Sequence, residues 1–254
     1  MILTIAQHEW HKLFKTGKLW KLLALCQFFL GLIFYWLMAE FLQNTQQSFV
    51  SSNPSFGITE KVIHPLFAWT TLFFFFMTPL FATQAITHER KAHTLQLYLT
   101  SAISVRDIIF GKFLGLLAAQ IFLLLPVLWM PLIIALHDHL DFGQYLSGMI
   151  GLILLLCSTL SLGLFIASFA KEPLMAAIMM FVSFILLSLL EWIPHFLDPN
   201  RSWIMELALL YHCKNFFSGI INSRDIIYYC VLSSLFLYLS ILRLEREPST
   251  QRRT

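Results

Sequence analysis

Residues 145–193 read YLSGMIGLILLLCSTLSLGLFIASFAKEPLMAAIMMFVSFILLSLLEWI, two long apolar runs separated only by Lys171, Glu172 and Pro173. A helix that crosses a bilayer needs about 20 mostly apolar residues, and each run supplies that length. Similar runs occur on both sides of this stretch. Together they predict six spans, at residues 19–42, 62–86, 113–136, 145–170, 174–193 and 226–242, the last of them short.

The composition agrees with a membrane protein. Apolar residues make up 58% of the 254 residues and charged residues only 12%. A globular core does not require so many apolar residues, whereas a bundle whose helices face lipid does. We therefore predict an all-α polytopic protein with six transmembrane helices in one domain, residues 1–254. Pro79 and Pro126 predict kinks in the second and third spans.

The basic residues predict an orientation. If the N-terminus is cytoplasmic, 13 of the 17 Lys and Arg residues fall in inside segments. This bias follows the positive-inside rule and predicts that both termini are cytoplasmic. The 13 residues are Lys12, Lys15, Lys18, Lys21, Arg90, Lys91, Arg106, Lys112, Lys171, Arg243, Arg246, Arg252 and Arg253. Because they are spread over several membrane-flanking segments, they give little support to a nucleic-acid partner.

The first 18 residues predict a helix in the inner membrane interface. Apolar residues recur there at helical spacing, with His, Glu and Lys between them, and Trp10 and the lysines suit an interfacial anchor. A solvated leader is the alternative. The apolar run after Lys21 is longer than the apolar region of a signal peptide, and no small-x-small cleavage site follows it, so we expect a retained span.

The inside connector at residues 87–112 is too long for a simple turn. From His88 it reads HERKAHTLQLYLTSAISVRDIIFGK, and residues 94–99 form a short helical pattern. Ser101, Ser104 and Asp107 offer a cap for a following helix. The pattern favours a surface helix that docks on a cytoplasmic partner, and a helix resting on lipid headgroups is the alternative. Two further connectors also suggest function. In the tight inside turn at 163–173, the small residues Gly163 and Ser168 allow close helix contact. In the outer segment 194–225, the pattern of apolar and polar residues predicts one or two short helices.

These residues resemble the permease subunit of type-2 ABC exporters, in particular the gliding-motility-like group, which is also likened to permeases of copper-enzyme maturation systems. The resemblance covers nearly the whole chain. Inside, it is carried by Glu89, Thr94, Leu97, Leu99, Thr100, Ser104, Gly111 and Lys112, and at the inner turn by Gly163 and Ser168. Before the last span, it is carried by Phe216, Gly219, Asp225 and Tyr228. The chain departs from the family pattern at His93, Glu172 and Cys213.

The resemblance implies a bacterial inner-membrane protein with a cytoplasmic coupling helix between spans two and three. It also implies a second permease copy, in a homodimer or heterodimer, and a separate ABC ATPase subunit that binds ATP and Mg. The chain has no GxxxxGK[ST] phosphate loop of its own. We therefore expect no enzyme activity, catalytic residue, cofactor site or metal site in the chain itself. Glu89, Thr94, Leu97, Leu99, Ser104, Gly111 and Lys112 are the expected ATPase-coupling residues.

Other interpretations remain open. The chain is either a transporter subunit or a non-transporting membrane scaffold coupled to an ATPase for signalling or envelope remodelling. A membrane-embedded enzyme, such as a protease or acyltransferase, is disfavoured, because the one histidine within a predicted span, His64, lies at the end of its span and not at the depth of Ser158 or Ser161. A disulfide between Cys213 and Cys230 and a metal site are weaker alternatives. The possible metal ligands are His137, Asp138, His139, Asp141, His195 and His212.

Overall fold

The computed structural model describes residues 1–51, 57–91, 104–134, 141–190 and 206–246. In these residues the chain is all-helical, as predicted. The α-helices are α1 (Ile2–Lys15), α2 (Lys18–Ser51), α3 (His64–Lys91), α5 (Val105–Ile134), α6 (Phe142–Phe169), α7 (Pro173–Leu189), α10 (Leu209–Phe217) and α11 (Ser223–Glu245). A short π-helix, η1 (Thr59–Ile63), leads into α3.

Five helical segments in the described residues are long and apolar enough to cross a membrane, which supports a multi-pass membrane protein. They are Leu19–Asn44, Thr59–Thr87, Val105–Ile134, Phe142–Phe169 and Ser223–Glu245. The fifth predicted span, 174–193, coincides with α7, which has 17 residues. A helix of that length rises about 26 Å, less than the roughly 30 Å of a hydrocarbon core. Of the helices at the predicted spans, α7 is thus the short one, whereas the last, which was predicted to be short, has 23 residues.

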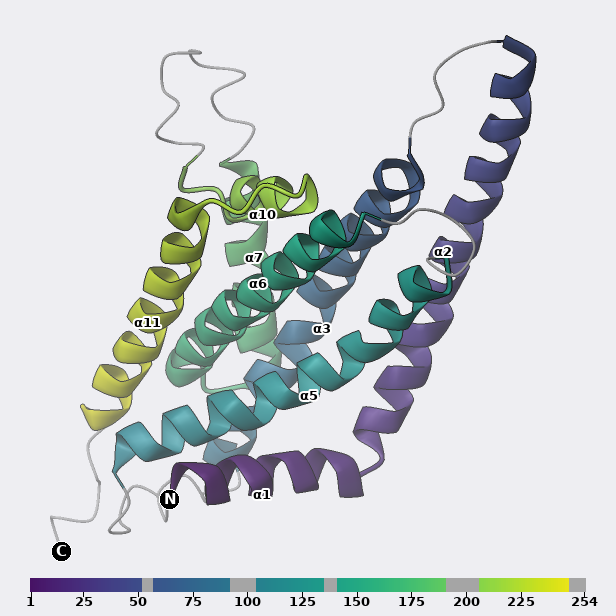
Figure 1. Ribbon diagram of the computed structural model, residues 1–254. Coiled ribbons are helices and arrows are strands. Elements are labelled where there is room, and N and C mark those ends of the chain that lie inside the picture. The colour runs from purple at the N-terminus through teal and green to yellow at the C-terminus, as the bar shows by residue number, and fades with distance from the viewer. Residues whose placement is uncertain (52–56, 92–103, 135–140, 191–205, 247–254) are drawn as a thin grey trace, which may run out of the picture.

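The helices form an elongated bundle with α6 at its centre (Figure 1). Helix α6 contacts α11, α3, α10, α7 and α5. Close packing depends on small residues: a Cβ at Gly163 would lie 2.5 Å from Ala82 Cβ and 2.7 Å from Met180 Cε. The expected role of Gly163 in close helix contact is confirmed.

Helices α2 and α7 keep many apolar side chains exposed. On α2, Tyr35 is 73% exposed, and on α7, Leu174 is 71% exposed. Such faces suit contact with lipid or with another apolar helix. Several polar side chains inside the bundle form hydrogen bonds. The Gln120 amide of α5 donates to the Thr78 hydroxyl of α3 at 3.0 Å, and the Thr83 hydroxyl donates to the carbonyl of Pro79, which lies inside α3.

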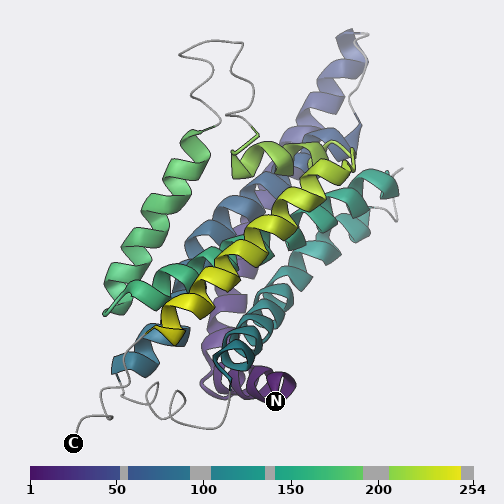
Figure 2. The same cartoon turned by 90° about the vertical axis from the view of Figure 1, so that its left-hand side faces the viewer.

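Helix α1 lies across one end of the bundle (Figures 1 and 2). The C-terminal end of α11 and the beginning of α5 lie at this same end, and α10 lies at the opposite end. The transverse placement of α1 agrees with the helix predicted for residues 1–18. The described ends of the chain therefore lie on one side of the bundle, which is what an even number of crossings requires.

Both helices that flank the predicted coupling connector continue beyond the predicted spans. Helix α3 extends to Lys91 and α5 begins at Val105, so Gly111 and Lys112 lie inside α5 and not in the connector. The hydroxyl of Ser104 accepts a hydrogen bond from the backbone N–H of Asp107 at 3.2 Å, which confirms that Ser104 caps the helix start. The predicted coupling helix at 94–99 lies outside the described residues.

Candidate coupling site between α1, α3 and α5

Helix α1 is seated on α5 by two glycines one turn apart. A Cβ at Gly111 would lie 2.7 Å from Ile5 Cβ, and a Cβ at Gly115 would lie 2.8 Å from the Ala6 carbonyl oxygen. Side chains at these positions would therefore push the two helices apart. The spacing Gly-x-x-x-Gly is the arrangement that lets helix backbones approach closely in membrane proteins.

Between these glycines, Lys112 points into the α1–α3–α5 junction and is 2% exposed. Its ammonium nitrogen contacts Glu9 Oε1 of α1 at 2.7 Å, Glu89 Oε1 of α3 at 2.6 Å and the Ala85 carbonyl oxygen at 3.0 Å. An ammonium group has three N–H donors, and these three acceptors use all of them. Lys12 lies further out, 3.9 Å from Glu9 and 3.8 Å from Glu89.

The cluster of Glu9, Lys12, Glu89 and Lys112, here called the ion cluster, contains two carboxylates and two ammonium groups. Burial raises the pKa of Glu9, but the positive charge and hydrogen bond of Lys112 lower it by more, so the net pKa of Glu9 is lowered. Glu9 is therefore ionised at neutral pH. Buried charges are stable only when they are paired and hydrogen-bonded. The ion cluster meets this condition only while the three helices stay together.

The end of α3 is also tied to the opposite side of the bundle. Arg90 donates hydrogen bonds to the carbonyl oxygens of Ala170 at 2.6 Å and Ser168 at 2.9 Å. These carbonyls belong to the C-terminal end of α6, where a cation also interacts favourably with the helix dipole. The adjacent residues Glu89 and Arg90 thus connect one end of α3 to α1 and α5 on one side and to the α6–α7 turn on the other.

The structure brings together part of the predicted coupling set. Glu89, Gly111 and Lys112 meet at the junction with α1, and Ser104 lies at the beginning of α5. Thr94, Leu97 and Leu99 lie outside the described residues. Glu89 was expected to contact an ATPase directly, but it is 5% exposed and its carboxylate faces Lys112. A role of Glu89 in coupling would therefore act through the ion cluster.

Sequence reasoning missed Glu9. It was assigned to the polar face of α1, whereas its side chain is buried, with 4% exposed, and faces α5. The available signal was weak: Glu9 is the first acidic residue of the chain, in a segment rich in lysine and histidine. Its partner Lys112 lies 103 residues away, so only the tertiary fold brings the two together.

At the other end of the bundle, α10 and the start of α11 form a hydrogen-bonded cap around Asp225. Its carboxylate contacts His212 Nδ1 at 2.5 Å and accepts from the Asn215 amide at 3.1 Å. His212 Nε2 lies 2.7 Å from the Glu206 carbonyl oxygen, and its ring stacks on Tyr228 with centroids 4.1 Å apart.

The predicted outer residues Phe216, Gly219, Asp225 and Tyr228 all belong to this cap. Phe216 is buried against α6, so closely that a Cβ added at Gly151 of α6 would lie 2.6 Å from the Cβ of Phe216. Gly219 has φ +81°, a left-handed conformation that other residues adopt at a cost. Helix α10 thus confirms a short helix in the outer segment 194–225, whose first part, 194–205, lies outside the described residues.

The structure bears on the two weaker alternatives, the Cys213–Cys230 disulfide and the metal site. All four cysteines are free, with Cys213 buried and Cys230 exposed, so the two do not form a disulfide. The described residues contain no group of three or more His, Cys, Asp or Glu side chains that could hold a metal ion. Asp141 instead caps α6 by accepting from the backbone N–H groups of Gly143 and Gln144. His137, Asp138, His139 and His195 lie outside the described residues.

The transmembrane-length helices, the transverse α1 and the junction beneath them define a polytopic helical membrane component. The sequence matches the family described as ABC-2 family transporter protein over residues 3–247. The chain therefore belongs to the ABC-2 transporter family and is a membrane component of it. No curated protein matches the chain.

Proposed function

We propose that the chain is the permease subunit of a type-2 ABC exporter of the bacterial inner membrane, driven by a separate ATPase. Membership in the ABC-2 family supports the proposal, as does the lack of a phosphate loop in the sequence. Both termini are proposed to be cytoplasmic, which places α1 on the inner side. A second copy or a homologous permease would complete the transport path, and the exposed apolar faces of α2 and α7 leave room for such a partner.

The observation that carries the coupling mechanism is the ion cluster. The connector 92–103 joins α3 to α5, and Lys112 ties both helices to α1. A push on the connector by an ATPase would thus move α1, α3 and α5 as one unit. Arg90 would pass part of the same motion to the α6–α7 turn. The outer cap around Asp225 is proposed to hold the far ends of α6 and α11 while the inner ends move.

In this mechanism Thr94, Leu97 and Leu99 supply the ATPase contact, and Glu89, Gly111 and Lys112 transmit it. Apolar anchors seated in a groove typically cost about 2 kcal/mol or more when truncated, which is roughly a thirtyfold loss of affinity. Replacing Leu97 and Leu99 together with alanine should therefore release the ATPase that co-purifies with the wild-type chain.

The test is co-purification of the ATPase with tagged wild-type and double-mutant chains from the native membrane. A matched control replaces Leu174 and Leu189 with alanine, because both are exposed leucines of α7, far along the chain from the connector. We expect the control to retain the ATPase and the Leu97→Ala/Leu99→Ala chain to lose it while keeping its melting temperature. Full retention by the double mutant would assign the contact to another segment.

A further inference from the structure

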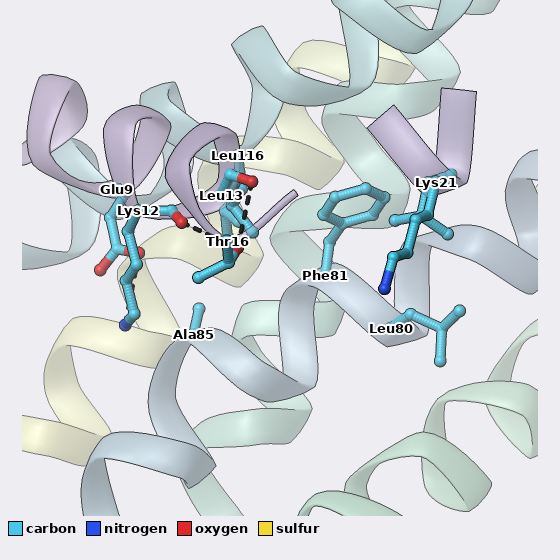
Figure 3. Close-up of a pocket in the computed structure, with 10 residues that line it drawn as sticks. Glu9, Lys12, Leu13, Thr16, Lys21, Leu80, Phe81, Ala85 and Leu116 are labelled. Atoms are coloured by element: carbon cyan, nitrogen blue, oxygen red, sulfur yellow. Dashed lines mark hydrogen bonds and ion pairs between the residues drawn. The ribbon is translucent and has the colours of Figure 1, made fainter. Parts of the chain in front are cut away.

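A cavity of about 380 Å³ lies between α1, the beginning of α2, α3 and α5 (Figure 3). Its floor is apolar and buried: Phe81 and Ala85 of α3 and Leu116 of α5 are each less than 5% exposed. Leu13 and Leu22, which are half-buried, also belong to this apolar lining. The volume falls within the range of pockets that hold small ligands.

The rim of the cavity carries positive charge. Lys12 and Lys21 both line it, on either side of the apolar floor, together with Thr16 (Figure 3). Lys21 is exposed and makes no ion pair within the described residues. The cavity also contains the carboxylate of Glu9, which Lys112 binds at 2.7 Å. The two carboxylates and two ammonium groups of the ion cluster balance one another, so the net positive charge of the rim is that of Lys21. A ligand entering the cavity therefore meets an apolar floor and a rim with one positive charge in excess.

We propose that this cavity binds an anionic phospholipid, with an acyl chain on the floor and the phosphate group between Lys12 and Lys21. An anionic amphiphile is the ligand that uses both features. A small soluble anion would leave the apolar floor in contact with water, and a neutral lipid would gain nothing from the lysines. The cavity lies beside the transverse helix α1, and an amphipathic helix in the membrane interface lies where lipid headgroups meet acyl chains.

The test is native mass spectrometry of the full-length chain, given equal amounts of phosphatidylglycerol and phosphatidylcholine with the same acyl chains. We expect the wild-type chain to retain phosphatidylglycerol preferentially. One lysine near a membrane surface contributes roughly a fivefold factor toward an anionic lipid, so Lys21→Ala should lower the preference by about that much. Lys15→Ala is the matched control, because Lys15 is an exposed lysine nearby that does not line the cavity.

Two further arms test the apolar part of the site. Thr16→Trp places a large ring at the exposed rim and should reduce retention of both lipids, while the melting temperature stays at the wild-type value. Glycerol phosphate carries the charge without the chains and should compete poorly with phosphatidylglycerol. Equal retention of the two lipids by the wild-type chain, or equal losses in Lys15→Ala and Lys21→Ala, would overturn the proposal. Effective competition by glycerol phosphate would overturn it in favour of a soluble anion.

Discussion

Replacing Lys112 with methionine should strongly destabilise the bundle. Methionine is long, flexible and apolar, so it can occupy the space of the lysine stem without supplying its charge. The change removes the closest cation from the buried carboxylates of Glu9 and Glu89, which are 4% and 5% exposed, while Lys12 stays at 3.9 and 3.8 Å. Removing one partner of a buried ion pair typically costs about 3–5 kcal/mol.

This cost translates into a measurable shift in melting temperature. For a chain of this size, each kcal/mol corresponds to roughly 2–4 °C, so we expect Lys112→Met to melt about 10 °C below the wild-type chain. The assay is thermal unfolding of the detergent-solubilised protein followed by tryptophan fluorescence. Trp10 of α1 is a suitable reporter of the junction, because its ring contacts Phe122 of α5 with centroids 5.6 Å apart.

A variant without the three buried charges of the ion cluster, here called the charge-free variant, provides the control for this prediction; the half-exposed Lys12 is kept. Changing Glu9 and Glu89 to glutamine together with Lys112→Met removes the uncompensated charge and should recover most of the lost stability. If Lys112→Met melts like the wild-type chain, the ion cluster does not hold the junction together. If the charge-free variant melts as low as Lys112→Met, the cause is lost packing, and the reasoning from charge is refuted.

Two other changes test the same junction. Gly115→Leu should detach α1 and shift the Trp10 emission to longer wavelength, because even a Cβ at this position would lie 2.8 Å from an α1 carbonyl oxygen. Gly31→Ala is the control and should leave the spectrum unchanged, because its Cβ would have only an ordinary contact at 3.9 Å. Because the pKa of Glu9 is lowered in the folded state, its contribution is fully present above its ordinary pKa of 4.5 and is lost as the pH falls through the folded value. The difference in melting temperature between wild type and Glu9→Gln should therefore be constant near neutral pH and vanish in acid; a difference that persists in acid would show that the Glu9 charge is not its source.

The sequence predicts the helical class and most span positions because hydropathy reports directly on the energy of placing a segment in lipid. It predicts the helix ends less well. Residues 87–91 and 105–112 are polar enough to fall outside a hydropathy window, yet they are helical because Glu89, Arg90 and Lys112 find partners on other helices. Such partners are far apart in the chain, and no local pattern signals them.

In the candidate site, too, the sequence predicts some residues but not the contacts between residues that are far apart in the chain. Gly111, Lys112 and Glu89 were found through a resemblance, while Glu9 was missed because an acid among lysines reads as a solvent-facing residue. Phe216, Gly219, Asp225 and Tyr228, predicted as an outer motif, lie together in the cap formed by α10 and the start of α11, whereas His212, which contacts Asp225 there, was considered only as a metal ligand. Its pairing with Asp225 depends on the turn between α10 and α11, whose geometry the sequence alone does not give.

The seating of α1 has a consequence for the order in which the protein is made. Glu9 leaves the ribosome long before its partner Lys112, 103 residues later. At a synthesis rate of roughly 5–20 residues per second, the carboxylate waits about 5–20 s for its counter-ion. During that interval α1 can stay in the aqueous interface, because Gly17, with φ +66° and no atom within 4 Å of its Cβ position, joins it to α2 without side-chain contact. Helix α1 can therefore be locked in place only after the beginning of α5 has been synthesised, although α2 and α3 precede α5 in the chain.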